Sequence, residues 1–126
     1  MKKDCKTQIL LAEDDVNVLL SLEFILKSQG YAVETAVNGR EALEKIQASR
    51  PEIAILDVTM PELNGFEVSR EIKKRLGFSV YVILLTARSS DEDRRTGEES
   101  GVDEYLLKPY NPDKLLESIE KQIKKT

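Results

Sequence analysis

The sequence predicts an α/β protein built on a doubly wound parallel sheet, and three observations support this. Five short apolar segments alternate with longer amphipathic ones, in a (βα)5 pattern, along 126 residues, the length of one domain. Several apolar segments have no polar residue, as expected of strands that helices cover on both faces. Right-handed crossovers then place helices on both sides of the sheet. We expect one domain over residues 1–126, with a polar leader at 1–7.

Each element follows from its own residues. The apolar runs predict five strands: Ile9 to Glu13, Ala32 to Thr35, Ile53 to Asp57, Val80 to Leu85 and Asp103 to Leu107. Apolar residues at helical spacing predict the buried faces of three helices: Val18, Leu22, Ile25 and Leu26, then Val68, Ile72 and Leu76, then Leu115, Ile119 and Ile123. We expect Asp15 to be the N-cap of the first helix. Glycines suited to helix ends and prolines suited to element starts mark further boundaries: Gly30, Gly77, Pro51 and Pro112.

One segment departs from this pattern. Residues 88–101 (RSSDEDRRTGEESG) should hold the fourth helix, yet they include no aliphatic or aromatic residue. A helix that is polar all round is weakly held or bridges solvent. Two readings remain open: a short solvated helix, or a surface whose order depends on a switch.

Composition excludes several functions. The net charge of -4 argues against direct nucleic-acid binding, which needs a basic surface. The absence of histidine excludes a histidine general base, a Ser-His triad and histidine-bound zinc. Cys5 is the single cysteine, so no intrachain disulfide is possible. No apolar stretch resembles a signal or membrane-spanning segment, so we expect a cytoplasmic protein without a membrane partner.

Acidic residues follow two of the predicted strands. Glu13 and Asp14 come after the first strand run and Asp57 ends the third. In a doubly wound sheet ligands bind at the carboxyl ends of the strands, so these side chains should meet there. Clustered carboxylates repel one another unless a cation lies among them, and Mg²⁺ prefers such oxygen ligands. The sequence predicts Asp14 and Asp57 as direct ligands, Glu13 directly or through water, and the backbone carbonyl of Thr59 as a further ligand. The alternative is that the negative charges of Glu13 and Asp14 only stabilise the N-terminus of the first helix.

Asp57 is the candidate nucleophile at this site. A carboxylate can attack a phosphoryl donor and form an acyl phosphate. Lys108, which follows the fifth strand, would contact a phosphoryl oxygen, and the hydroxyl of Thr86 would bond another. Taken alone, Thr86 is also explained as a β-branched residue at a strand end.

Four motifs together resemble the receiver domain of bacterial two-component response regulators. They are LLAEDD, LDVTMPELNGFEV, LLTA and YLLKP, and the resemblance covers about residues 8 to 124. It implies a flavodoxin-like sheet in the order 2-1-3-4-5 flanked by five helices. Glu13 and Asp14 match the acidic pair of the family and Asp57 its phosphoacceptor. Thr86 and Lys108 match its hydroxyl and lysine positions.

The resemblance also implies a mechanism. A histidine kinase or phosphotransfer protein would donate a phosphoryl group to Asp57 in a step that needs Mg²⁺, for which Mn²⁺ should substitute. Tyr105 matches the aromatic switch position, which turns inward with Thr86 and changes the face formed by the fourth helix, fifth strand and fifth helix. Thr59 and Arg88 match positions that control water access to the acyl phosphate, although Arg88 can equally be an exposed charge.

Further expectations follow from the family. The Lys108-Pro109 bond is expected to be cis, and Gly65 is expected to adopt a backbone conformation that other residues avoid. The output would be a downstream protein or a missing output domain, with a phosphorylation-dependent homodimer as a further possibility. The chain would be no enzyme in the ordinary sense, but a phosphoacceptor that assists its own phosphotransfer and autodephosphorylation.

Other classes fit less well. A haloacid-dehalogenase-type phosphatase would carry a second aspartate where Thr59 stands. Dinucleotide binding would need a Gly-x-Gly-x-x-Gly motif after the first strand. A pseudo-receiver that binds partners without phosphorylation is the alternative, although such proteins lose acidic, aspartate or lysine positions that this chain retains.

Overall fold

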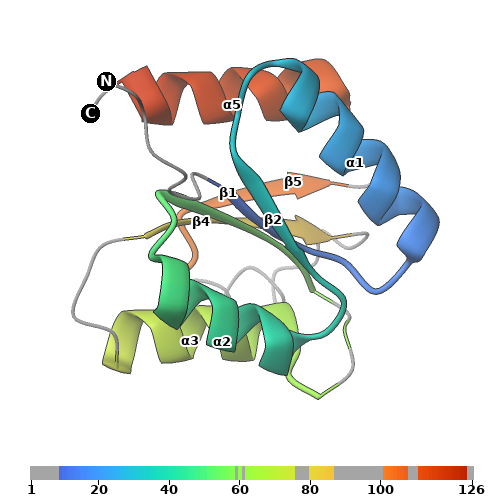
Figure 1. Cartoon of the computed structure of the whole chain (residues 1–126). Coiled ribbons are helices and arrows are strands. Elements are labelled where there is room, and N and C mark those ends of the chain that lie inside the picture. The colour runs from blue at the N-terminus through green and yellow to red at the C-terminus, as the bar shows by residue number, and fades with distance from the viewer. Residues whose placement is uncertain are drawn as a thin grey trace.

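The chain folds into a parallel sheet between two pairs of helices (Figure 1). The computed structural model describes residues 9–58, 60, 62–75, 80–86, 101–107 and 111–124. In chain order the elements are β1 (Ile9–Ala12), α1 (Val16–Ser28), β2 (Val33–Ala36), α2 (Gly39–Ser49), β3 (Ile53–Asp57), α3 (Gly65–Arg75), β4 (Tyr81–Thr86), β5 (Glu104–Leu107) and α5 (Pro112–Lys124). None of the described helices is both long and apolar enough to cross a bilayer.

The sheet confirms the predicted fold class. Its strand order is β2-β1-β3-β4-β5, and every neighbouring pair is parallel. α1 and α5 cover one face, and α2 and α3 cover the other (Figure 1). The fourth of the five expected helices would fall in residues 88–101, which lie mostly outside the described residues, so the described part of the chain contains four helices.

The predicted strand limits need small corrections. β1 ends at Ala12, although the N–H of Glu13 still donates to the carbonyl of Ala36 at 3.1 Å. β2 begins one residue later than predicted, because Val33 is the residue that pairs with Ile9 in the ladder. β4 similarly covers Tyr81–Thr86, which places Thr86 inside the strand.

The core consists of two layers separated by the sheet, because successive strand residues point to opposite faces. Leu10, Leu56 and Leu84 pack with the buried residues of α2 and α3. Ile9, Leu11, Ile53, Ile55, Ile83 and Leu85 pack with those of α1 and α5. Strands buried on both faces explain why these segments read as continuous apolar runs.

The helices bury most of the residues expected of them. Six residues that the sequence places on buried helix faces are buried: Leu22, Leu26, Val68, Ile72, Leu115 and Ile119. Val18 and Ile25 are only half-buried, while Leu19, which was not predicted, is buried. The buried stripe of α1 therefore runs along Leu19, Leu22 and Leu26. Asp15 is the N-cap of α1 and Pro112 is the first residue of α5, as predicted, whereas Leu76 and Gly77 lie outside the described residues.

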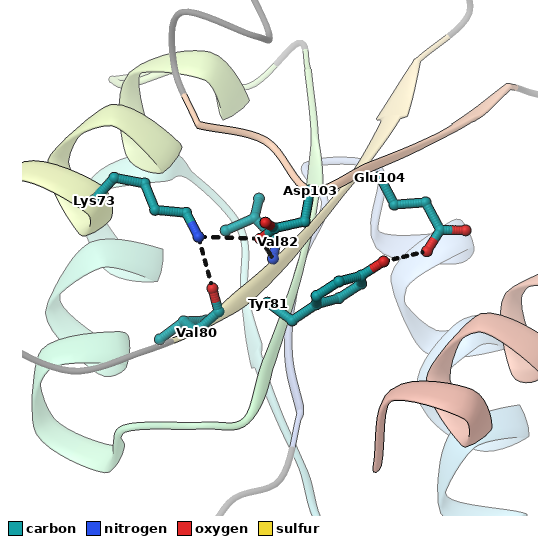
Figure 2. A network of polar contacts seen from close by, with 6 residues as sticks. All are labelled: Lys73, Val80, Tyr81, Val82, Asp103 and Glu104. Atoms are coloured by element: carbon teal, nitrogen blue, oxygen red, sulfur yellow. Dashed lines mark hydrogen bonds and ion pairs between the residues drawn. The ribbon is translucent and has the colours of Figure 1, made fainter. Parts of the chain in front are cut away.

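A polar network joins the amino ends of β4 and β5 (Figure 2). Lys73 Nζ of α3 donates to the Val80 carbonyl and to Asp103 Oδ2, each at 3.0 Å. The same oxygen accepts the Val82 N–H at 2.7 Å. Beside it, Glu104 accepts from the Tyr81 hydroxyl at 2.9 Å and from the Ser118 hydroxyl at 2.5 Å. The network therefore fastens β5 to α3, β4 and α5 at the edge opposite the candidate site.

Candidate functional site

Three carboxylates meet at the carboxyl ends of β1 and β3. Oxygen atoms of Glu13, Asp14 and Asp57 all lie within 4.8 Å of one another. Glu13 is 1% exposed and Asp57 4% exposed, whereas Asp14 is open to solvent. The sheet brings these residues together because β1 and β3 are parallel neighbours. The predicted convergence of the acidic residues is thus observed.

Helix capping does not account for the acidic pair. The N-cap of α1 is Asp15, whose Oδ1 accepts the N–H groups of Asn17 at 3.0 Å and Val18 at 3.3 Å. Glu13 lies before the helix, and its Oε2 accepts the Asp15 N–H at 3.2 Å. The first turn of α1 itself holds no acidic residue. Glu13 and Asp14 are therefore placed toward Asp57 rather than used to cap the helix.

The environment of Asp57 is built by close backbone contacts. Asp57 is the last residue of β3, and the next residue, Val58, donates its N–H to the Leu85 carbonyl at 3.0 Å. Gly65 begins α3 against this strand end: a Cβ added there would lie 2.6 Å from the Asp57 carbonyl oxygen and 2.7 Å from Leu84 Cδ1. The expectation that Gly65 needs an unusual backbone conformation is wrong, because the described positive-φ glycines are Gly30 and Gly101. Glycine is needed at this position because a side chain would collide with the Asp57 carbonyl and with Leu84.

The two predicted switch residues occupy neighbouring strands. Thr86 ends β4, is 4% exposed, and pairs with Leu107 of β5. Tyr105 pairs with Leu84 and is half-buried against the layer that contains α2 and α3. Thr86 therefore lies at the same edge as Asp57, with Tyr105 two residues back along the adjoining strand.

Several predicted site residues lie outside the described residues. These are Lys108 and its bond to Pro109, Thr59 and Arg88. Their roles stay predictions, as does the suggested polar leader at residues 1–7. Lys108 follows Leu107, the last residue of β5, in the sequence.

The donor set fits a hard divalent cation. Three carboxylate groups supply the oxygen ligands that Mg²⁺ prefers, and one exposed member leaves room for the waters that Mg²⁺ usually keeps. Burying Glu13 beside Asp57 is costly for two like charges, and a bound cation would offset that cost. These three residues could therefore hold a divalent cation such as Mg²⁺.

Sequence reasoning did not identify one contact near this site. Gly39, the first residue of α2, packs directly on the backbone of Leu63, in the loop that follows Asp57. The only available signal was the Asn38-Gly39 pair, which marks a turn or helix start without naming a partner.

The fold, with three carboxylates at the carboxyl ends of neighbouring parallel strands, is that of an α/β domain with a candidate cation site, and comparison with known proteins gives the family. The model of the response regulator receiver domain matches residues 9–120, so the chain belongs to the response regulator receiver family. The chain is 40% identical over 119 residues to "Response regulator MprA" of Mycolicibacterium vanbaalenii, covering 94% of this chain and 51% of that protein. It is 41% identical over 120 residues to "Transcriptional regulatory protein CpxR homolog" of Haemophilus influenzae, covering 95% of this chain and 52% of the relative.

Solved structures agree with this assignment. The chemotaxis protein CheY4 of Vibrio cholerae is similar with a TM-score of 0.82 and 33% identity, covering 91% of this chain and 97% of that one. The receiver domain of a signal transduction histidine kinase from Syntrophus aciditrophicus gives a TM-score of 0.88 at 32% identity, covering 95% and 92% of the two chains. The chain spans about half the length of the curated relatives it matches.

Proposed function

We propose that Asp57 accepts a phosphoryl group from a histidine kinase or phosphotransfer protein, in a step that depends on Mg²⁺. The observation that carries this proposal is the buried Asp57 carboxylate with oxygens of Glu13 and Asp14 within 4.8 Å. Glu13, Asp14, Asp57 and the backbone carbonyl of residue 59 would hold the cation. When bound, the cation neutralises charge on the phosphoryl oxygens during transfer.

The residues of the chain divide the chemistry between them. An Asp57 carboxylate oxygen attacks phosphorus, the P–N bond of the donor's phosphohistidine breaks, and the imidazole leaves with the bonding electron pair. Lys108 contacts a phosphoryl oxygen, and the Thr86 hydroxyl donates to another. Water later attacks the same phosphorus, the bond between phosphorus and the Asp57 oxygen breaks, and Asp57 leaves as a carboxylate while inorganic phosphate is released. Thr59 and Arg88 set the rate of this step. The domain thus assists its own phosphotransfer and autodephosphorylation, and it is not an enzyme that turns over a separate substrate.

The added charge then shifts the protein between two packings. A phosphoryl group brings about -1.5 to -2 of charge, which draws Thr86 toward it. Tyr105 lies on the strand that pairs with β4, so movement of Thr86 opens space for that ring to turn inward. The face of the fourth helix, β5 and α5 changes as a result, which is a population shift.

The phosphodonor would dock over α1. Val16, Leu20 and Phe24 are 54%, 56% and 74% exposed, and their spacing of four residues puts them on one side of the helix. This apolar stripe begins directly after Asp15, beside the carboxylate cluster. A partner bound along it would place its phosphohistidine at Asp57.

The output would be a downstream protein or an output domain, since the curated relatives are about twice as long as this chain. One relative is named a transcriptional regulatory protein, which makes control of transcription a reasonable output for a longer protein of this kind. A phosphorylation-dependent homodimer and a cytoplasmic location complete the proposal.

The test is the intact mass of the protein after incubation with acetyl phosphate, with and without Mg²⁺. We expect a single phosphoryl adduct that requires Mg²⁺ and is absent from Asp57→Asn. Asp113→Asn, an exposed aspartate in the first turn of α5, is the matched control and should gain the adduct normally. Absence of any adduct in the wild-type protein would reject the proposal in favour of a phosphorylation-independent pseudo-receiver that acts as a scaffold.

A further inference from the structure

The segment that follows Asp57 returns to the end of β3 at the start of α3. The Gly65 N–H donates to the Val58 carbonyl at 3.0 Å, so the chain returns to the end of β3. Asn64 and Glu67 then cap α3 reciprocally, each backbone N–H donating to the other side chain at 2.8 Å. Both ends of the loop are therefore fixed, one by β3 and one by α3.

Leu63, two residues before α3, is held by α2. A Cβ added at Gly39 would lie 1.9 Å from the carbonyl oxygen of Leu63 and 2.6 Å from its carbonyl carbon. Both are backbone atoms, so a side chain could be accommodated only if the loop or the helix moved. Asn38 fixes the helix end, because its Oδ1 accepts the Glu41 N–H at 2.8 Å. Gly39 therefore sets how closely α2 approaches the loop.

The loop conformation is strained and needs support. Glu62 has a φ of 73°, in the left-handed region that costs roughly 1–2 kcal/mol for a residue with a side chain. Glu62 Oε1 pairs with Arg40 Nε at 3.4 Å, but both side chains are largely exposed and the pair contributes little. The backbone contact between Gly39 and Leu63 is the buried restraint next to this strained residue.

We propose that Gly39 is a positioning residue for the divalent-cation site. Its missing side chain lets α2 hold Leu63, and through Leu63 the start of α3, where Gly65 packs on the carbonyl of the proposed ligand Asp57. This inference rests on the proposed function. A methyl group at Gly39 would displace Leu63 from α2, disturb the contact of Gly65 with Asp57 and so weaken cation binding, although the carboxylates of Glu13, Asp14 and Asp57 are all retained.

The test measures Mn²⁺ affinity by isothermal titration calorimetry on the wild-type protein, Gly39→Ala and Gly30→Ala. Gly30 is the control, since its φ of 94° makes any substitution strained but no atom lies within 4 Å of an added Cβ. Changes in residues that support a metal site typically weaken binding by about 10–100-fold, and we expect Gly39→Ala to fall in that range. Gly30→Ala should lose stability to urea yet keep the wild-type affinity.

The outcomes separate the two proposals. If the wild-type protein binds no Mn²⁺, the proposed function and this inference both fail. If the wild-type protein binds Mn²⁺ and Gly39→Ala binds it equally well, or if both glycine variants lose affinity alike, only the role of Gly39 is rejected. Should Gly39→Ala not fold, Leu63→Gly removes the Cβ and side chain that lie beside Gly39 and frees the Leu63 backbone, which loosens the same contact without adding atoms. Weaker Mn²⁺ binding by that variant supports the role of Gly39, and unchanged binding overturns it.

Discussion

The two edges of the sheet use carboxylates in opposite ways. At the amino ends of β4 and β5, Asp103 accepts from a lysine and a backbone N–H, and Glu104 accepts from two hydroxyls. At the carboxyl ends of β1 and β3, Glu13, Asp14 and Asp57 lie within 4.8 Å of each other. The first arrangement joins its acids to a lysine, a backbone N–H and two hydroxyls, whereas the second brings three acids within reach of one cation, although Glu13 also accepts the Asp15 N–H.

This difference shows where the fold is stabilised and where it is prepared for a ligand. Hydrogen bonds to charged groups contribute about 1.5–3 kcal/mol each, so the contacts of Asp103 and Glu104 stabilise β5 in the sheet. We call the amino ends of β4 and β5 the amino edge and the carboxyl ends of β1 and β3 the carboxyl edge. Grouped like charges repel one another, and a bound cation relieves that repulsion. Changes at the amino edge should therefore affect stability, and changes at the carboxyl edge should affect binding.

The largest expected effect is at Asp103. Asp103→Ala removes the acceptor for the Val82 N–H and the ion-pair partner of Lys73, so the free energy of unfolding should fall by about 2 kcal/mol. Urea unfolding in EDTA measures this. Asp14→Ala, an aspartate of the opposite edge, is the comparison and should not be less stable than the wild-type protein. Equal losses in the two variants would contradict the division between the edges.

A smaller effect is expected at Tyr81, with a dependence on pH. Burial, together with the hydrogen bond to Glu104, raises the pKa of Tyr81 to about 12 from 10.0. Because the folded-state pKa is the higher one, this stabilisation is complete below pH 10 and is lost as the pH rises toward 12. Tyr81→Phe should cost about 1 kcal/mol at neutral pH and remove this part of the alkaline loss. Urea unfolding across alkaline pH would refute the account if both proteins lost stability in parallel.

The smallest change in the free energy of unfolding is expected at two residues with strained backbone, one near each edge. Arg50, the C-cap of α2 just before β3, has a φ of 50°, and Glu62, after Asp57, has a φ of 73°. Glycine relieves such strain, so each change to glycine should raise the free energy of unfolding by about 0.5–1 kcal/mol. Only Glu62→Gly should also weaken Mn²⁺ binding, because it loosens the loop that Gly39 holds. Weaker binding by Arg50→Gly would count against this distinction.

Much of the fold could be predicted because buried parallel strands have an unmistakable pattern. The runs ending at Ala12 and Asp57 have no alternation, and Asp15 and Pro112 mark helix starts by local chemistry. The start of β2 differs from its prediction by one residue because the register of this strand depends on pairing with β1, which is a tertiary property. Leu19 was missed for a similar reason, since neighbouring elements determine which side of α1 is buried.

The candidate site was predictable only where topology decides it. Glu13, Asp14 and Asp57 come together because strand ends of a parallel sheet share one edge. The network of Lys73 with Asp103 joins residues 30 positions apart, and nothing local in the sequence pairs them. The contact of Gly39 and the reason for Gly65 were likewise not predictable. Both glycines allow a close approach to the backbone of another segment, which their own conformation does not reveal.

The measurement that tests the account most directly is urea unfolding of the wild-type protein, Asp57→Asn and Asp103→Asn, in EDTA and in saturating Mg²⁺. A ligand at 100 times its Kd stabilises a protein by about 2.7 kcal/mol, which the wild-type protein and Asp103→Asn should both approach. In EDTA, Asp103→Asn should be less stable than the wild-type protein and Asp57→Asn at least as stable. Asp57→Asn should gain little from Mg²⁺. An equal gain in all three proteins, or no gain in the wild-type protein, would contradict the proposal that the carboxyl ends of β1 and β3 form a cation site around Asp57.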